Sequence, residues 1–158
     1  MEFRRAARDP WVWGQLVLIV AVLVLSGPLA RRLPGHGGSW TRWAAFSLLA
    51  LGLGVMFRGA TDLGRNLTPE TEPVPEGQLV TRGVYEFVRH PIYLGLSLGL
   101  MAVPLLSRNW LVALVVFALA IGYFEGKARA EERKLRLRFP RYREYAATVP
   151  RLLPFGWK

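Results

Sequence analysis

The stretch from Gly83 to Gly95 reads Gly-Val-Tyr-Glu-Phe-Val-Arg-His-Pro-Ile-Tyr-Leu-Gly, and it leads from a polar segment into an apolar run. Pro91 suits the first turn of a helix, where a missing N–H costs nothing. Arg89 and His90 would then lie at the N-terminus of a helix that begins at a membrane surface. Free N–H groups and the positive end of the helix dipole would favour an anionic group there, such as a carboxylate or phosphate. The alternative is that Arg89 and His90 are interfacial residues that only fix the depth of the helix.

Composition indicates a membrane protein of one domain, residues 1–158. The apolar residues make up 52% of the chain and gather in four blocks, each bounded by charge. With no cysteine, disulfides, thiolate catalysis and cysteine–metal sites are excluded, and two distant histidines argue against a histidine metal site. The net charge of +10 would suit nucleic acid or an anionic membrane surface. Because four apolar blocks are present, we expect the membrane and no nucleic acid.

The apolar blocks predict an all-α integral membrane fold with about four transmembrane helices. The expected spans are Trp11–Ala30, Trp43–Phe57, Ile92–Ser107 and Trp110–Phe124. The first is too long for the core of a signal peptide and is about as long as a bilayer crossing. The last two are about 22 Å each at helical rise, so they either borrow flanking residues or form a hairpin that only just reaches the far face.

The spans divide the chain into four segments. Residues 1–58 hold the two N-terminal spans, 59–90 form a proline-rich loop, and 91–126 form a helical hairpin joined at Arg108-Asn109. Residues 127–158 form a C-terminal helix and tail outside the membrane. His36 is expected to be a solvated histidine in the turn from Ala30 to Arg42.

The distribution of basic residues predicts the orientation. With four spans, both termini and the long loop share one side, which carries 17 of the 21 lysines and arginines. The positive-inside rule then places both termini in the cytoplasm. The absence of cysteine and the arginine-, glycine-, alanine- and leucine-rich composition suggest a prokaryotic plasma membrane.

The helix after Tyr123 is expected to continue into water. Glu131, Leu135, Phe139 and Tyr142 recur at helical spacing, which predicts one apolar or aromatic face, while the opposite positions are basic. A basic amphipathic helix on anionic lipid would explain the basic face. It would not explain two adjacent glutamates on the side that faces protein.

Two polar clusters, Arg89–Tyr93 and Lys127–Glu132, should meet because they flank one tight hairpin. They combine a cationic end for a carboxylate, glutamates for an ammonium, and electron-rich rings that can stabilise a sulfonium. The rings are Tyr85, Phe87, Tyr93, Tyr123, Phe124 and Tyr142. This set suits a zwitterionic amino acid ligand with an aromatic or cationic extension.

These motifs carry a family resemblance. Leu79-Val80-Thr81-Arg82-Gly83-Val84-Tyr85, then Arg89-His90-Pro91-Ile92-Tyr93-Leu94-Gly95, then Glu131-Glu132 followed by Leu135, Phe139, Tyr142, Tyr145, Val149 and Pro154, resemble the isoprenylcysteine carboxyl methyltransferase family. More broadly they are similar to membrane methyltransferases that include phospholipid N-methyltransferases. The resemblance covers 79–154, and the first two spans match only in being hydrophobic.

The resemblance implies S-adenosylmethionine as the methyl donor, S-adenosylhomocysteine as the product and a lipophilic acceptor taken from the membrane. The residues it assigns to the cofactor are Arg89, His90, Tyr93, Gly95, Glu131, Glu132, Tyr142 and Tyr145. It implies that Glu132, Lys127 and Arg129 serve the reaction, with Glu132 holding the amino group or lining the reaction centre. The tail from Arg151 to Pro154 would fold back over the pocket.

One departure from the family pattern bears on the acceptor. The family commonly has an arginine four residues before the double glutamate, where this chain has Lys127 with Arg129 nearby. Lysine lacks the guanidinium fork, so a carboxylate acceptor held by a forked arginine is in doubt. A carboxylate, a thiolate or an amine all stay open, and so does the oligomeric state. The alternative from another class is a non-catalytic helical membrane module that binds lipid or assists assembly.

Overall fold

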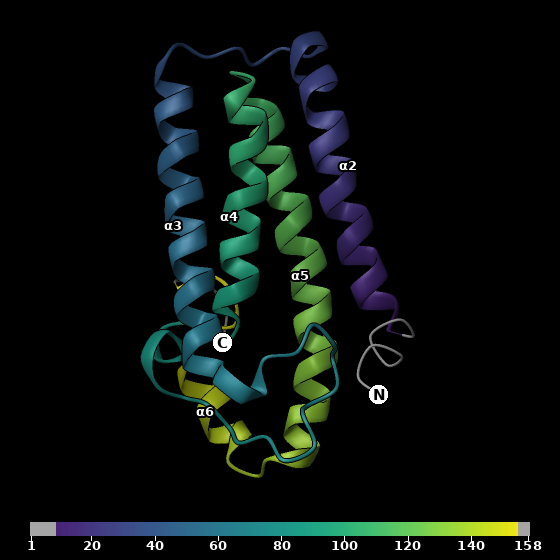
Figure 1. Ribbon diagram of the computed structural model, residues 1–158, viewed down its shortest axis with the longest axis vertical. Coiled ribbons are helices and arrows are strands. Elements are labelled where there is room, and N and C mark those ends of the chain that lie inside the picture. Colours follow the sequence, from purple (N-terminus) through teal and green to yellow (C-terminus); the bar gives the residue numbers. More distant parts are fainter. Residues whose placement is uncertain (1–8, 155–158) are drawn as a thin grey trace.

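The computed structural model describes residues 9–154, and its regular structure there is helical (Figure 1). Four long helices are α2 (Pro10–Arg32), α3 (Trp40–Leu63), α4 (Pro91–Leu106) and α5 (Trp110–Arg138). A short helix, α6 (Tyr142–Thr148), and two 3₁₀ turns, η1 (Gly64–Asn66) and η2 (Gly83–Glu86), complete them. The described part has no named strand, only an isolated bridge between His36 and Asn109. The predicted all-α fold is confirmed.

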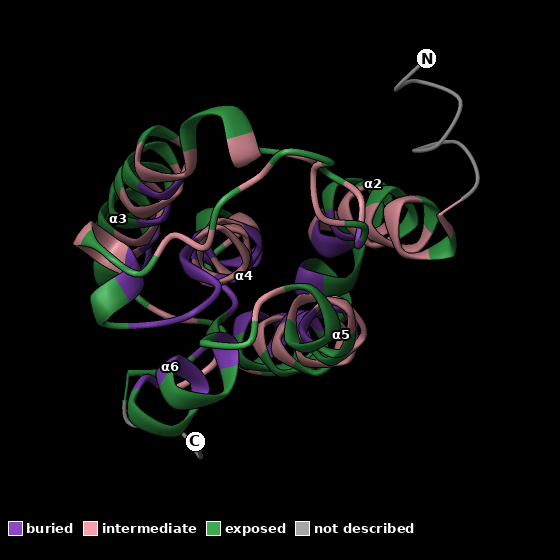
Figure 2. Ribbon diagram, turned by 90° about the horizontal axis from the view of Figure 1, so that it is seen from below, coloured by how far each residue is buried: buried purple, intermediate pink, exposed green. Residues whose placement is uncertain are grey.

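Three helices are long and apolar enough to cross a membrane, namely α2, α3 and α5. Helix α4 is apolar but has 16 residues, about 24 Å at helical rise. Four crossings therefore stay a prediction. Many large apolar side chains are exposed, such as those of Val17 (66% exposed) and Leu119 (60%). Figure 2 shows exposed residues along α2, α3 and α5. An apolar surface of this extent requires lipid rather than water around it.

The helix bounds differ from the sequence-based ones in three places. Helix α2 continues through Arg31 and Arg32, and α3 begins at Trp40, so the expected turn of 30–42 shortens to seven residues. Helix α3 also runs on to Leu63, five residues into the predicted loop. The predicted C-terminal helix breaks after Arg138, because Pro140 cannot continue it, and Tyr142 begins α6 instead.

The exposed loop position of His36 is as expected. The basic residues at 4, 5 and 8 lie outside the described range.

Helices α3 and α4 pack closely because two glycines face each other. A Cβ on Gly52 would lie 2.7 Å from the carbonyl oxygen of Gly95, and one on Gly95 would lie 2.5 Å from the carbonyl oxygen of Gly52. Gly54, which the sequence equally offers for close approach, has open space around it. This packing brings the N-terminus of α4 beside the C-terminal part of α3.

The end of the bundle away from α6 is fastened by Asn109, which is fully buried. Its Oδ1 accepts from the Val112 backbone N–H at 3.0 Å and so caps α5. Its Nδ2 lies 3.0 Å from the carbonyl oxygen of Ala30, and it also reaches those of Leu33 and Pro34. The hairpin of α4 and α5 is thereby joined to the end of α2.

Candidate functional site

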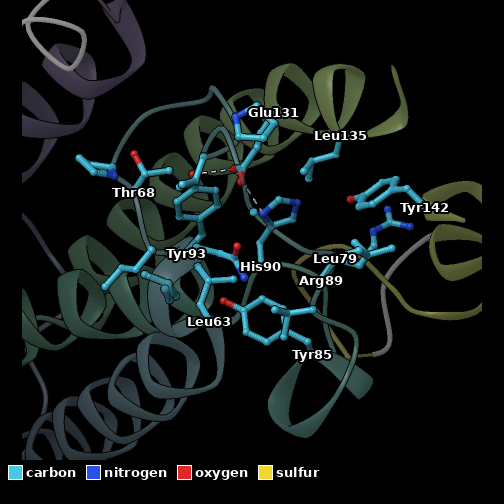
Figure 3. Close-up of a pocket in the computed structure, with 18 of the residues that line it drawn as sticks. Leu63, Thr68, Leu79, Tyr85, Arg89, His90, Tyr93, Glu131, Leu135 and Tyr142 are labelled. Atoms are coloured by element: carbon cyan, nitrogen blue, oxygen red, sulfur yellow. Dashed lines mark hydrogen bonds and ion pairs between the residues drawn. The ribbon is translucent and has the colours of Figure 1, made fainter. Parts of the chain in front are cut away.

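A cavity of about 420 Å³ lies at the end of the bundle that carries α6. Its walls come from α3, α4, α5, α6, the loop 67–80 and a single residue of α2 (Figures 1 and 3). The polar and charged lining residues are Gln15, Asn66, Thr68, Gln78, Arg89, His90, Lys127 and Glu131. Rings and aliphatic side chains line the rest, and they include Met56, Leu63, Tyr85, Ile92, Tyr93, Leu96, Leu135, Phe139, Tyr142 and Tyr145. The two clusters expected to meet do meet here.

The segment before α4 is held by the C-terminal tail. The backbone N–H of Arg89 donates to the carbonyl of Pro150 at 2.9 Å, and that of His90 donates to the carbonyl of Arg151 at 3.0 Å. The tail therefore folds back at Pro150 and Arg151 as predicted, but it does so against the start of α4. It does not line the cavity, so the expected cover over the pocket is not seen. These two amides, which the sequence would have left open for an anion, are occupied by the protein itself. An anion in the cavity therefore cannot be bound by these two amides.

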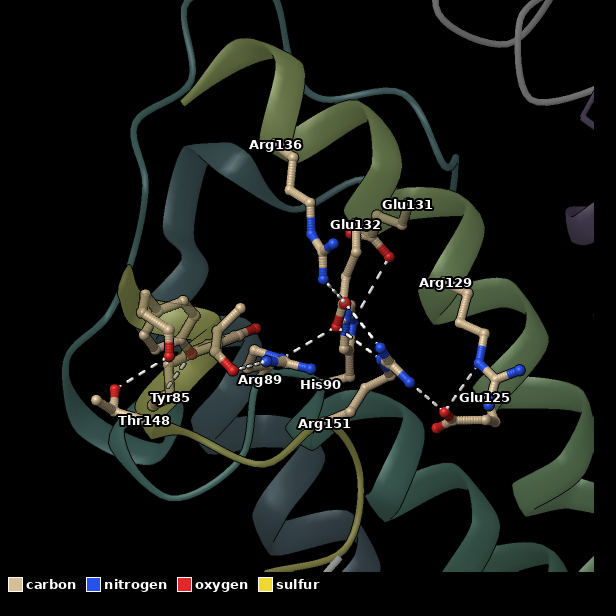
Figure 4. Close-up of polar contacts among 12 residues, drawn as sticks. Tyr85, Arg89, His90, Glu125, Arg129, Glu131, Glu132, Arg136, Thr148 and Arg151 are labelled. Carbon is tan, nitrogen blue, oxygen red and sulfur yellow. Dashed lines mark hydrogen bonds and ion pairs between the residues drawn. The ribbon is translucent and has the colours of Figure 1, made fainter. Parts of the chain in front are cut away.

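Glu132 lies behind the cavity wall, with its side chain 2% exposed. Its carboxylate accepts from Arg151 Nε at 2.9 Å and from Nη2 at 3.1 Å (Figure 4). It also lies 3.0 Å from Arg89 Nε and 3.2 Å from His90 Nε2. A buried carboxylate is stable only among such partners, so Glu132 fixes the positions of α4, α5 and the tail. It does not line the cavity, which corrects the expectation that it reaches the reaction centre.

Glu131 faces the cavity instead. Its carboxylate accepts from the Tyr93 hydroxyl at 2.9 Å and lies 3.7 Å from His90 Nδ1 (Figure 3). The Tyr93 ring stacks on His90 at 5.3 Å between centroids and on Phe124 at 5.1 Å. His90, Tyr93 and Glu131 thus form one packed unit in which a ring, an imidazole and a carboxylate are oriented together.

Lys127 lines the cavity and is 1% exposed. Its ammonium donates to Gln15 Oε1 at 2.6 Å and to the carbonyl of Pro69 at 3.1 Å, and it lies 5.2 Å from the centroid of the Tyr93 ring. It therefore ties α2 and the loop 67–80 to α5. Gln15 and that loop are cavity residues that sequence reasoning missed.

Three tyrosines close the side of the cavity near α6. The Tyr145 hydroxyl donates to the carbonyl of Tyr85 at 2.6 Å, and the Tyr85 hydroxyl donates to that of Gly59 at 3.3 Å. The Tyr142 hydroxyl is buried and has no hydrogen-bond partner among the described residues. Burial first, and then the charge of Glu132, raises the pKa of Tyr142 well above its ordinary value. The hydroxyl therefore keeps its proton and can donate it to a ligand.

Two predicted residues lie away from the cavity. Arg129 is largely exposed on α5, with 61% of its side chain accessible, and it pairs with Glu125 at 3.2 Å. It is not among the cavity residues, so its expected part in catalysis has no support in the geometry. Gly95 packs against Gly52 and Met56 at the contact of α3 and α4, which makes it a packing residue.

The sequence profile of the isoprenylcysteine carboxyl methyltransferase (ICMT) family matches residues 45–137, more than half of the chain and most of the cavity wall. The chain belongs to this family. Because three of its helices are long and apolar enough to span a bilayer, it is an integral membrane protein.

The chain is similar in sequence to relatives whose names describe different functions. The cobalt-zinc-cadmium resistance protein CzcN of Cupriavidus metallidurans is 32% identical over 84% of this chain and 61% of its own length. Protein-S-isoprenylcysteine O-methyltransferase B of Arabidopsis thaliana is 29% identical over 89% of this chain and 73% of its own length. Methanethiol S-methyltransferase 1 of Bradyrhizobium diazoefficiens is 36% identical over 46% of this chain and 25% of its own length. The chain thus spans about three fifths of CzcN.

Proposed function

We propose that the protein transfers a methyl group from S-adenosylmethionine to a lipophilic acceptor at the membrane surface. The observation that carries the proposal is the cavity, in which Arg89, His90 and Glu131 meet a set of tyrosine rings at the edge of an apolar bundle. Family membership and two methyltransferase-named relatives support the reaction class.

The charged and aromatic residues that line the cavity fit S-adenosylmethionine. Arg89 and Lys127 would face its carboxylate, and Glu131 would face its ammonium, because each charge prefers its opposite in a site with little water. The faces of the Tyr85, Tyr93 and Tyr142 rings are electron-rich, which suits a positive sulfur. The unpartnered hydroxyl of Tyr142 is a further donor for a ligand acceptor atom.

Helices α3 and α4 supply the site for the acceptor. Met56, Ile92 and Leu96 extend the cavity wall from the charged cluster toward the apolar part of the bundle. A lipophilic chain could lie along them, with its nucleophilic end at the charged cluster. When bound, S-adenosylmethionine would supply a methyl carbon on a positive sulfur, so the protein needs mainly to align the acceptor and exclude water.

The residue roles follow from the contacts. His90, Tyr93 and Glu131 would orient the cofactor, and Glu132 with Arg151 would hold His90 and Arg89 in place. A thiolate or carboxylate acceptor needs no base, whereas an amine could pass its proton to Glu131. Lys127 would keep the loop 67–80 closed over the cavity through its bond to Pro69.

The test is methyl transfer from radiolabelled S-adenosylmethionine in proteoliposomes supplied with lipophilic thiols, carboxylates or amines. Label should enter one class of acceptor and fall by about tenfold or more in Glu131→Gln, which loses a charged contact. Glu144→Gln is the matched control, because Glu144 is an exposed glutamate on α6. If no acceptor is labelled by folded protein, the proposed reaction is wrong. If acceptor is labelled equally by the two variants, Glu131 does not hold the cofactor.

A further inference from the structure

A second cavity, of about 400 Å³, lies outside the one described above and shares only Arg89 with it. We name it the arginine pocket. It is formed by Arg89, Arg136, Arg143, Ala146, Ala147 and Arg151. Four guanidiniums thus face a space that two small side chains on α6 leave open. Methyl transfer as proposed above uses Arg89 and Arg151 but assigns no ligand to this space.

The charge in the arginine pocket is not balanced by the carboxylates around it. Glu132 pairs with Arg89 and Arg151 and lies 3.7 Å from Arg136 (Figure 4). Glu125 is the other carboxylate in reach, and it is shared between Arg151 and Arg129. Arg143 has no carboxylate within 4.0 Å in the range 9–154. The pocket therefore keeps a positive excess that an anion would neutralise.

A purely structural function does not account for all four arginines. Arg89 and Arg151 hold the tail against α4 and are largely buried. Arg136 keeps 48% of its side chain exposed, and Arg143 is exposed on α6. Guanidinium groups that remain accessible around an open space are suited to binding phosphate. Each planar guanidinium can donate two parallel hydrogen bonds to two phosphate oxygens.

We expect the arginine pocket near a membrane–water interface, because it lies where the apolar part of α5 ends. Arg151 pairs with Glu125, which directly follows Phe124 in α5. Next to Glu125, a Cβ on Gly126 would contact the ring of Trp11, an interfacial residue type near the start of α2. Two exposed apolar side chains lie within two residues of pocket arginines in sequence, Phe87 (70% exposed) and Leu137 (89%). Such side chains outside the spans are expected where the surface contacts lipid.

We propose that the arginine pocket binds a phosphate group, that of an anionic phospholipid headgroup at this face of the membrane. The same chemistry would accept free phosphate, but the interfacial height and the neighbouring apolar side chains favour the lipid. Bound lipid would bridge α5, α6 and the tail, and so would stabilise the elements that enclose the first cavity.

The test is native mass spectrometry of the full chain in detergent, titrated with phosphatidylglycerol. The double variant Arg136→Gln/Arg143→Gln should lose affinity by about tenfold or more, since each interfacial arginine contributes to binding of an anionic lipid. Its control is Arg133→Gln/Arg141→Gln, which removes the same charge from exposed positions outside the pocket. Arg143→Gln alone breaks no ion pair and should show part of the loss in a protein of unchanged helix content.

Two further titrations separate the possible ligands. Oleate, an anionic lipid without phosphate, should bind more weakly than phosphatidylglycerol, and inorganic phosphate should not displace the lipid at comparable concentration. Displacement by inorganic phosphate would assign the pocket to a free anion instead. Equal binding by the pocket and control variants would overturn the proposal, because it would leave only a diffuse basic surface.

Discussion

At the scale of single residues, Tyr142 and Tyr145 form a natural pair for comparison. Both are buried cavity tyrosines on α6, but Tyr145 donates its hydroxyl to a carbonyl and Tyr142 has no partner among the described residues. Tyr142→Phe should leave the melting temperature unchanged or higher, since an unmade buried hydrogen bond costs about 1–3 kcal/mol. It should nevertheless weaken S-adenosylmethionine binding, because a donor to the ligand is lost.

Tyr145→Phe is the control for that prediction. It removes a hydrogen bond that is made, so the melting temperature should fall. Thermal unfolding and calorimetric binding on the same detergent samples measure both effects. If Tyr142→Phe lowers stability and leaves affinity intact, Tyr142 is a structural residue and not a ligand donor.

Glu132 is the residue on which the charged groups of the site depend. Glu132→Ala would leave Arg89, His90 and Arg151 without their common carboxylate. Removing one partner of a buried ion pair costs about 3–5 kcal/mol, so we expect a clear fall in melting temperature as well as lost cofactor binding. Unchanged unfolding and unchanged binding together would show that Glu132 does not organise the site.

At the scale of secondary structure, the contact of α3 and α4 sets the position of Arg89 and His90. Gly52→Ala should destabilise the protein by about 1–3 kcal/mol, because its Cβ would overlap the backbone of α4. Gly54→Ala, two residues away on the same helix, meets open space and should be neutral. Chemical unfolding of the two variants measures the difference. Equal stabilities would mean that the two helices are not in close contact.

Some features of the fold depend on the local sequence and could be predicted from it, whereas others depend on packing between helices and could not. The approximate positions of the apolar helices and the meeting of the two polar clusters follow from apolar block length and from the short link at Arg108-Asn109, so the sequence was sufficient for them but not for the helix ends. Adjacent helical residues point in directions about 100° apart, as 3.6 residues per turn require. Which of Glu131 and Glu132 faces the cavity is therefore decided by α4 and the tail.

Long-range partners were also beyond the sequence. Lys127 was predicted as a site residue, but its contacts with Gln15 and Pro69 join segments that are far apart in the chain. The break between α5 and α6 could have been expected from Pro140, which the helical spacing of aromatic residues concealed. Arg129 and Lys127 are both basic residues of α5, but they lie on different sides of that helix. Only the packing shows that Lys127 faces the cavity and Arg129 does not.

At the scale of the whole molecule, the orientation in the membrane is still a prediction. The chain has no cysteine, so a thiol reagent would label only a cysteine that is introduced at a chosen position. Ser39→Cys lies at the end of the bundle away from the cavity, and Glu144→Cys lies at the cavity end. A membrane-impermeant maleimide added to intact cells should label position 39 and not position 144, according to the basic residue distribution. The opposite pattern would reverse the orientation.

The central claim is that the cavity binds S-adenosylmethionine, and calorimetric titration of the detergent-purified protein tests it most directly. The account predicts binding of S-adenosylmethionine and S-adenosylhomocysteine that weakens by about tenfold or more in His90→Ala, because a charged or polar contact of about 1.5–3 kcal/mol is lost. His36→Ala, at the exposed histidine of the distant loop, should bind as the unmodified protein does. Absence of binding by folded protein, or equal affinity in the two histidine variants, would contradict the account.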